Sequence, residues 1–548
     1  MTQTSPSTAT TKKGWLALVA LATAQFVMVL DQSVMNVSIS TLVHDFNTTV
    51  PTIQAVITFY CLVMAMLMMS GAKIGDIIGR RRAFVIGLII YACGSAMTAA
   101  APTVLILTLG WSVLEGIGAA LVLPSLVALI AGNFEGPRRK VAYAVIGGVA
   151  GAGIAIGPIL GGWATTEYSW RIVFIGEVIL VLFILLMTGK VGDVPRPDPV
   201  PKFDGVGSLL SATGLGLVVL GVLESTTWGW VKPKDSPISP FGLSLTLYVI
   251  AAGAVLIWGF VTWQRHREQT GSDPLVHLSL ARVPSVRSGL AGLFSQNLIL
   301  MGVFFVIPLY LQLVLGLDAL QTGVKMLPVS ITMFLAAAAG SRLSNRFPVR
   351  TLVRSGLVVT IAGTLILLST IQPTLSNVGF AIGMAVLGIG MGLIVSQLGN
   401  VVQSSVEDSG RSEAGGLQYT GQQLGSSLGV ALIGAIVLAG LAGTFIANVE
   451  NDPRISAEVS SQVGVAVGSN TNFVSSTEIE TAANKAGLDS ATTTALVEDY
   501  ELAQLRSLKT GLLAAALLAL LSLAFTRELP HERPTRPQKK PQLEPAAE

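Results

Sequence analysis

Apolar runs of about twenty residues recur from one end of this 548-residue chain to the other. A helix that crosses the ~30 Å hydrocarbon core of a bilayer needs about 20 such residues. This length predicts fourteen spans, at roughly 15–38, 52–72, 83–101, 104–131, 142–165, 171–189, 205–224, 241–263, 288–315, 323–341, 351–371, 378–402, 416–446 and 507–526. The expected fold class is an all-α polytopic membrane protein.

Composition excludes the other broad classes. Charged residues make up 12% of the chain, against roughly 25% in soluble domains, and 51% of the residues are hydrophobic. This is too little charge for a soluble surface and too much apolar content for disorder. The net charge of +3 does not indicate a nucleic-acid partner. Cys61 and Cys93 lie in apolar runs without metal or redox spacing, so we expect no metal and no cofactor.

The basic residues orient the chain. With the N and C termini both cytoplasmic, 26 of the 34 Lys and Arg residues fall on the cytoplasmic side, as membrane proteins prefer. The outer loop 447–505 then carries nine acids and two bases. It could gather cations or simply be a solvated loop. No loop contains a nucleotide-binding glycine loop, so neither an enzyme nor an ATP-driven pump is expected.

An internal repeat divides the chain. Ala72–Arg82, after span two, and Ser341–Arg350, after span ten, place basic, aliphatic, Asp/Asn and turn-forming residues in the same order. Coincidence between short basic loops is the alternative. Each loop follows the second helix of a six-helix block if spans seven and eight are an insertion. The predicted parts are a tail at 1–14, a six-helix bundle at 15–190, a linker with two inserted helices at 191–287, a six-helix bundle at 288–526 and a tail at 527–548.

Span five carries a stripe of small residues. Glycines four residues apart lie on one helix face and let neighbouring backbones approach closely, and a proline bends the helix. The residues concerned are Gly153, Gly157, Pro158, Gly161 and Gly162. We expect a tightly packed, kinked span.

These motifs resemble those of a known family. Ala72–Arg82 is similar to the signature loop of the major facilitator superfamily, with Ala72 and Ile77 in place of its first glycine and of an arginine. Gly153–Gly162 matches every fixed position of its antiporter motif, G-x-x-x-G-P-x-x-G-G. Leu30–Val37 resembles the first-helix motif of the fourteen-helix drug:proton antiporters. Ser169–Arg171 and Gln422–Gly429 also fit, and the likeness runs from about residue 15 to 526.

The resemblance implies a fold and a function. The fold would be the major facilitator fold, two six-helix bundles plus two inserted helices, in the plasma (inner) membrane of a bacterium. The function would be proton-coupled export of lipophilic small molecules by a monomer, with the span-five motif sealing the exit against leak. Asp76, Gly79 and Arg80 would form a conformational latch, with Asp76 at a helix N-terminus of the other bundle or paired with Arg80.

Acids inside the spans are the candidate coupling sites. A carboxylate in the membrane costs several kcal/mol unless it is paired or protonated, so it is a functional candidate by default. Glu115 lies near the middle of span four, Asp31 in the outer part of span one, and Glu177 in span six, close in sequence to Arg171. The apolar parts of these spans hold no ion-pair partner, which favours proton binding. A hydrogen-bonded structural role is the alternative for each.

Span four departs from the family. The family's pattern of arginine, two residues, glutamine and glycine reads Ser112, Val113, Leu114, Glu115 and Gly116 here. Our hypothesis is that Glu115 replaces the missing arginine's function by alternating between a proton and a cationic substrate. The chain is expected to export hydrophobic cations. Export of an endogenous metabolite or lipid is one alternative, and a membrane sensor or scaffold without transport is another.

Overall fold

The computed structural model describes residues 8–134, 136–406, 410–469 and 472–531, so the ends of both predicted tails lie outside it. The described residues form helices and no strand, and fourteen of the helices are long and apolar enough to cross a membrane. These are α1 (Thr8–Val37), α3 (Val50–Ile78), α4 (Arg80–Ala99), α5–α6 (Val104–Leu107 and Gly116–Asn133), α7 (Gly136–Glu167), α8 (Arg171–Met187), α9 (Gly205–Trp228), α10 (Leu245–Gln269), α12 (Pro284–Leu309), α13 (Ala319–Leu343), α14 (Val349–Thr370), α15 (Asn377–Ser404), α16 (Arg411–Asn451) and α19 (Ser490–Ser522). The all-α polytopic fold is confirmed.

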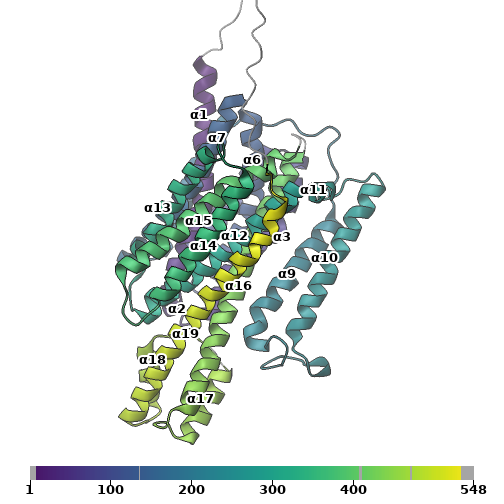
Figure 1. Cartoon of the computed structure of the whole chain (residues 1–548). Coiled ribbons are helices and arrows are strands. Elements are labelled where there is room, and N and C mark those ends of the chain that lie inside the picture. The colour runs from purple at the N-terminus through teal and green to yellow at the C-terminus, as the bar shows by residue number, and fades with distance from the viewer. Residues whose placement is uncertain (1–7, 135, 407–409, 470–471, 532–548) are drawn as a thin grey trace, which may run out of the picture.

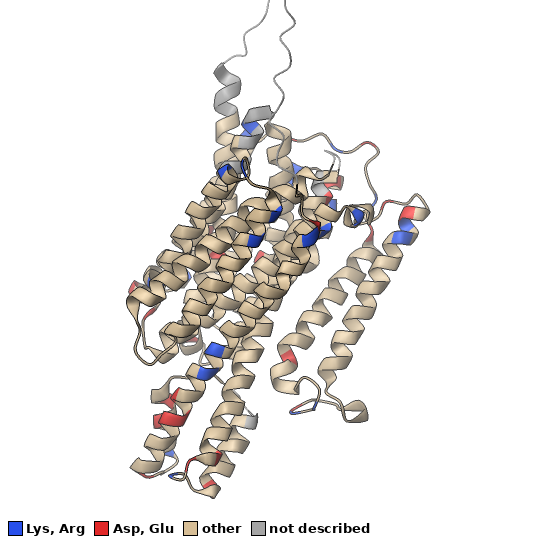
Figure 2. Ribbon diagram, viewed as in Figure 1, with Lys and Arg blue, Asp and Glu red and all other residues tan. Residues whose placement is uncertain are grey.

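We call α1 to α8 the N-terminal six and α12 to α16 with α19 the C-terminal six, counting only the membrane helices. Figure 1 shows the helices running roughly along one direction, with the start of α1 and the end of α19 toward the same end of the molecule. Figure 2 shows Lys and Arg gathered mainly toward that end. This end is therefore the cytoplasmic side by the positive-inside rule.

Local sequence signals set several helix ends. Thr49 caps α3 by accepting a hydrogen bond from the Thr52 N–H, and Pro51 lies in the first turn, where its missing N–H is not needed. The turn between α3 and α4 passes through Gly79 at φ +102°, a conformation that glycine adopts without strain. Asp318 and Gln321 form a capping box at the start of α13.

The inserted helices α9 and α10 pack against each other at the edge of the molecule (Figure 1). Glycines allow this close approach: a Cβ added to Gly253 would lie 2.8 Å from the carbonyl oxygen of Gly214. The pair also packs on α3 and α16, and the hydroxyls of Ser70 and Ser208 lie 2.5 Å apart. The pair thus adds to one side of the two six-helix sets.

Residues 447–505, expected as an outer loop, are largely helical. α16 runs on to Asn451 and α19 begins at Ser490, while α17 (Ala457–Ser469) and α18 (Ser476–Lys485) lie between them. Figure 1 shows this segment at the end opposite the start of α1. The Phe445 and Tyr500 rings meet edge to face at 5.1 Å. The start of α19 is too polar to be recognised as a membrane span from the sequence, but its apolar side chains are buried on one face of the helix.

Candidate functional site

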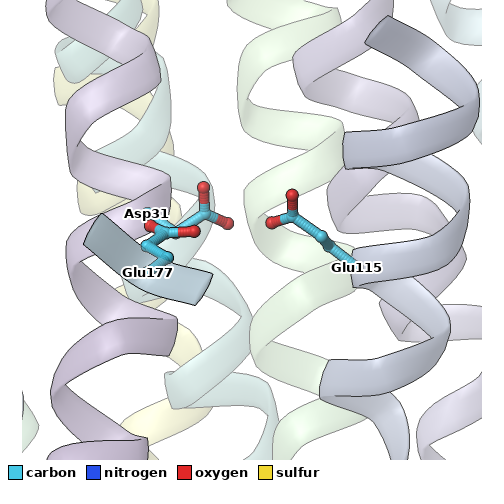
Figure 3. A group of neighbouring side chains, drawn as sticks. All are labelled: Asp31, Glu115 and Glu177. Carbon is cyan, nitrogen blue, oxygen red and sulfur yellow. The ribbon is translucent and has the colours of Figure 1, made fainter. Parts of the chain in front are cut away.

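Three carboxyl groups meet inside the N-terminal six. Asp31 of α1, Glu115 directly before α6 and Glu177 of α8 each offer an oxygen within 4.8 Å of the others'. Figure 3 shows Glu115 reaching across to the other two side chains. The side chains are almost fully enclosed, with 0%, 0% and 1% exposure. We call these three residues the carboxyl trio; they are the acids that the sequence singled out one by one.

Each member of the trio accepts a hydrogen bond on one oxygen. Trp111 donates its indole N–H to Asp31 Oδ1 at 2.8 Å. Tyr91 and Ser95 donate to Glu177 Oε2 at 3.1 and 3.2 Å. Thr98 donates to Glu115 Oε1 at 3.2 Å. These donors hold the carboxyl groups in place without neutralising them.

The second oxygen of each carboxyl is unoccupied. Asp31 Oδ2, Glu115 Oε2 and Glu177 Oε1 are buried with no hydrogen-bond partner among the described residues. No ion pair joins the trio to a described Lys, Arg or His. Two full charges 4.8 Å apart repel by ~3 kcal/mol even at an effective dielectric constant of ~20. The arrangement is suited to binding protons, because three such charges cannot be held together unpaired.

The backbone around Glu115 is specialised. Thr108–Glu115 forms a π-helical turn between α5 and α6, a feature that is frequent at functional sites. Gly94 of α4 lies opposite, where an added Cβ would be 2.6 Å from Glu115 Cγ and 2.8 Å from the Gly110 carbonyl oxygen. Only a glycine at position 94 lets α4 approach closely enough for its hydroxyls to reach the trio.

The donors around the trio were not predicted. Tyr91, Ser95 and Thr98 follow one another at spacings of four and three residues, which places them on one face of α4. A polar stripe within an apolar span was the signal that could have found them. Trp111 stacks on Tyr60 of α3 at 4.6 Å and an interplanar angle of 12°. The position of Trp111 beside Asp31 depends on tertiary packing, so no local sequence pattern predicts it.

Glu177 is not partnered by Arg171, despite their closeness in sequence. Arg171 lies instead with Asp45 at 3.5 Å and donates to the Ala101 carbonyl at 2.9 Å. Its guanidinium also stacks over Trp170 at 4.3 Å. The side chain of Glu177 points inward to the trio, so it belongs to the site rather than to the outer surface.

The latch residues adopt one of the two predicted arrangements. Asp76 and Arg80 form an ion pair across one helical turn, from the end of α3 to the start of α4. Gly79 makes the turn between them. Close by, Lys73 lies 3.7 Å from Glu413 of α16, which joins the two sets on the cytoplasmic side.

His277 adds a third partner to this cytoplasmic contact, one that the sequence did not indicate. It lies in the segment between α10 and α12, and its Nδ1 is 2.8 Å from Glu413 Oε2. The hydrogen bond with Glu413 raises the pKa of His277 above its usual 6.5, although partial burial and Lys73 oppose the shift. The residues are too far apart in sequence for any pattern to have linked them.

The glycine stripe of α7 packs as predicted, mainly on α1. A Cβ added to Gly157 would lie 2.3 Å from Ser33 Cβ, and one on Gly161 would lie 2.9 Å from Val34 Cα. Gly162 packs instead on the C-terminal six, where its Cβ would lie 2.4 Å from the Ala319 carbonyl oxygen. Gly153 continues the stripe beside Val29, and Pro158 lies inside the helix. The stripe thus presses α1, with Asp31, against α7.

Three carboxylate oxygens so close together could also coordinate a hard cation such as Na⁺ or Ca²⁺. The sequence did not indicate a metal site here, since the three acids lie on three separate spans. In this structure the hydroxyls of Tyr91, Ser95 and Thr98 and the indole N–H of Trp111 donate their hydrogens to the trio, an arrangement that also suits carboxyl groups that bind protons.

Comparison with known proteins relates this arrangement to a family. The model of the Major Facilitator Superfamily matches residues 21–430. The probable actinorhodin transporter of Streptomyces coelicolor is 30% identical over 80% of this chain and 75% of its own. The multidrug efflux pump LfrA of Mycolicibacterium smegmatis is 27% identical over 95% and 97%. In fold, a bacterial homolog of the human lysosomal transporter Spinster, inward-facing and occupied, matches 93% of this chain and 95% of its own with a TM-score of 0.57 at 14% identity.

The match covers most of the chain, and the helices that it includes carry the carboxyl trio, the Asp76–Arg80 ion pair and the glycine stripe. The protein is therefore a multi-pass transport protein of the inner membrane and not an enzyme. The chain belongs to the major facilitator superfamily.

Proposed function

We propose that this chain is a proton-coupled antiporter that exports hydrophobic, cationic organic compounds by alternating access. The observation that carries the proposal is the carboxyl trio, which is enclosed in the membrane without a basic partner among the described residues. Protons from outside would load the trio and favour the inward-facing state. Their release to the cytoplasm would allow the next cargo molecule to be exported.

The names of similar proteins support export. Besides the efflux pump LfrA, they include the tetracenomycin C resistance and export protein of Streptomyces glaucescens, 26% identical over 80% of this chain. They also include the multidrug resistance protein Stp of Mycobacterium tuberculosis, 26% identical over 79% of this chain. Each is named for moving or resisting organic compounds, and the likeness spans most of the membrane helices.

The trio's enclosure separates the proton from the cargo. Glu115 is fully buried and its neighbours pack within van der Waals contact, so a bulky organic cation does not fit beside it in this conformation. This modifies the hypothesis that Glu115 alternates between a proton and the substrate itself. We propose that the trio binds protons alone, and that Asp76–Arg80 and the glycine stripe act as latch and seal.

The test uses purified protein in liposomes that contain a pH-sensitive dye. Addition of a transported cation should release protons in the wild type. Glu115→Gln, Asp31→Asn and Glu177→Gln should each lower this proton flux by at least ~10-fold, since each removes one site of the trio. Glu224→Gln on the inserted helix α9 is the matched control, because it neutralises a membrane acid outside the trio.

An imposed sodium gradient without a proton gradient distinguishes the two kinds of ligand. It should drive no uptake. If a sodium gradient drives transport and all three trio variants abolish it, the ion that the trio binds is a metal cation and not the proton. Unchanged proton flux in Glu115→Gln would overturn the assignment of the trio.

A second candidate is export of a self-made metabolite. The actinorhodin transporter and the cephamycin export protein CmcT of Amycolatopsis lactamdurans, each 30% identical over 80% of this chain, are named for single compounds. A panel of cationic, neutral and anionic compounds in the same liposomes separates the candidates. Proton release by many unrelated cations supports the first, and release by one neutral or anionic compound alone supports the second.

A further inference from the structure

The helix α1 has contacts on two faces at one level. Asp31 turns into the N-terminal six, where it accepts the hydrogen bond from Trp111. The next residue, Gln32, donates its amide N–H to Gln423 Oε1 of α16 at 2.9 Å. Successive residues of an α-helix differ by about 100° in direction, so neighbouring positions reach different partners. One short stretch of α1 therefore touches both the trio and the C-terminal six.

A second contact holds the outer end of α1. Gln312, at the outer end of the span that begins with α12, donates to the carbonyl of Val37 at 2.8 Å. Val37 is the last residue of α1, and its carbonyl is one that the helix itself cannot satisfy. Gln312 also accepts a hydrogen bond from the Ser40 hydroxyl at 2.6 Å. Gln312 thus bonds the end of α1 and the segment that follows it.

Both glutamines are suited to a contact that must form and break. Their side chains are 7% and 8% exposed, so water does not compete strongly for the bonds. Amide side chains carry no net charge, and parting them leaves no unpaired ion in the membrane, unlike parting a buried ion pair. Opening the outer side requires these bonds to break, because they join helices of opposite sets.

We propose that α1 links the protonation of the carboxyl trio to the outer contact between the two sets, and that Gln312 and Gln423 are the positioning residues of this link. The inference deepens the proposed function and rests on it for the identity of the ion. A change in the charge at Asp31 shifts α1, and the shift reaches Gln423 through Gln32 and Gln312 through Val37. Proton loading favours the bonded, outward-closed arrangement.

The experiment measures the opening of the outer side of the protein as the distance between two spin labels. Spin labels are placed on cysteines at His44 and Thr374, exposed outer positions on opposite sets, in protein whose exposed Cys93 is replaced by alanine. Cys61 is buried and stays. In lipid nanodiscs, the wild type should shift from the short to the long distance as the pH rises and the trio loses its protons.

The variant Gln312→Ala/Gln423→Ala should raise the long-distance population by about tenfold or more at low pH and flatten its dependence on pH. Adding Glu115→Gln, which keeps one trio position neutral, should change the distance distribution in the wild-type background and leave it unchanged in the variant. This failure of additivity is what coupling through α1 requires. The single glutamine variants should give intermediate results and guard against a folding defect.

Ser330→Ala is the matched control. Ser330 of α13 donates to the Ile154 carbonyl of α7 at 3.1 Å, another buried bond between the sets that does not involve α1. Removing this hydrogen bond should shift the pH at which the distance changes by half. The full change of distance with pH and the full effect of Glu115→Gln on it should remain. A full pH response in the double glutamine variant, or its equal loss in Ser330→Ala, overturns the inference.

The two proposals fail in different ways. If Glu115→Gln has no effect on the distance in the wild-type background although the glutamine variants still open the outer side, the trio is not the proton site and the proposed function fails. If Glu115→Gln acts equally in both backgrounds, the trio stands and the link through α1 is wrong.

Discussion

Gly94 shows how one side chain's size controls the candidate site. An added Cβ would lie 2.6 Å from Glu115 Cγ and 2.8 Å from the Gly110 carbonyl oxygen. Backbone atoms cannot move aside as a flexible side chain can, so α4 would have to shift. The hydroxyls of Ser95 and Thr98 ride on α4 and would shift with it.

Gly94→Ala is therefore expected to destabilise the protein by about 1–3 kcal/mol and to reduce proton release in liposomes. Thermal unfolding followed by tryptophan fluorescence measures the first effect. Gly176→Ala, next to Glu177 on α8, has nothing within 4 Å of the added Cβ and should be neutral or slightly stabilising. Equal melting temperatures for the two variants would contradict the packing of α4 on Glu115.

The sequence singled out the three membrane acids one by one but did not predict that they meet. Asp31, Glu115 and Glu177 stand out because a carboxyl group in an apolar span needs a reason. Their meeting depends on how three helices pack, and that packing is set by glycines such as Gly94 whose partners lie far away in the chain. Closeness in sequence to Arg171 does not make Glu177 its partner, since a helical side chain's direction is decided by the neighbours of its face.

Among the elements, α7 links the glycine motif to the trio. Gly157 lies against Ser33 and Gly161 against Val34, on the turn of α1 that follows Asp31. Widening this contact by one methyl group must push α1 away from α7. The element's packing therefore fixes the position of Asp31.

Gly157→Ala should lower stability by about 1–3 kcal/mol and raise the passive proton leak of liposomes that contain the protein. Gly147→Ala in the same helix has nothing within 4 Å of the added Cβ and serves as the control. The proton leak rate of each variant is measured with the dye and compared at equal protein content. A leak no larger than that of Gly147→Ala would mean that the stripe only packs helices.

The segment between α10 and α12 is tied to α16 by a titratable bond. Glu413 holds the pKa of His277 above 6.5, so the folded protein favours the protonated ring. The bond's contribution is then complete below pH 6.5 and is lost as the pH rises through the raised value. Glu268, which bonds the Leu278 N–H, favours the same charge, while Lys73 opposes it.

Hydrogen exchange of the amides from Leu275 to Leu280 should accordingly be slower below pH 6.5, after correction for intrinsic rates. The effect is about 0.5 kcal/mol, because the ring is half exposed and surface ion pairs are weak. His277→Gln keeps a donor that does not titrate and should remove the pH dependence. His266→Gln, beside Trp263 on α10, should retain it.

Periodicity and length predicted the elements well where lipid surrounds them. The first span was expected at 15–38 and is described as Gly14–Val37, and the seventh was expected at 205–224 and runs over Gly205–Trp228. The last span was expected at 507–526 but belongs to a helix that begins at Ser490. The added turns lie outside the apolar run, where only one face is buried, so a rule that counts apolar residues cannot find them.

For the whole molecule, the contacts between the two sets differ at the two ends. Hydrogen bonds of uncharged groups join them from the middle outward, as between Gln32 and Gln423. Near the cytoplasmic end, the charged pair of Lys73 and Glu413 joins them. Parting the uncharged bonds leaves no unpaired ion in the membrane, whereas parting the pair of Lys73 and Glu413, whose side chains are 5% and 15% exposed, leaves two largely buried charges unpaired. The contacts from the middle outward are therefore the less costly ones to open.

The inserted pair α9 and α10 contributes none of these bonds between the two sets. It packs on α3 and α16, but no residue of the trio, the latch or the glycine stripe lies on it. In a bilayer, the apolar surface uncovered by its removal would meet lipid tails rather than water, which costs little. The six-plus-two-plus-six division, which remains a proposal, therefore predicts that the pair is dispensable for folding.

Replacement of residues 205–269 by a flexible Gly/Ser linker should yield protein that elutes as a single species in size-exclusion chromatography, melts a few degrees lower and still releases protons on addition of substrate. Deletion of residues 349–404 is the matched control, since it also removes two spans, α14 and α15, and so keeps the orientation of the later helices, but this pair packs on α12, α13 and α19 within the C-terminal six. That protein should aggregate, because the loss uncovers helix faces that hold the set together. An aggregated 205–269 variant would instead make the inserted pair part of the core, and proton release lost from a well-folded one would give α9 and α10 a part in transport.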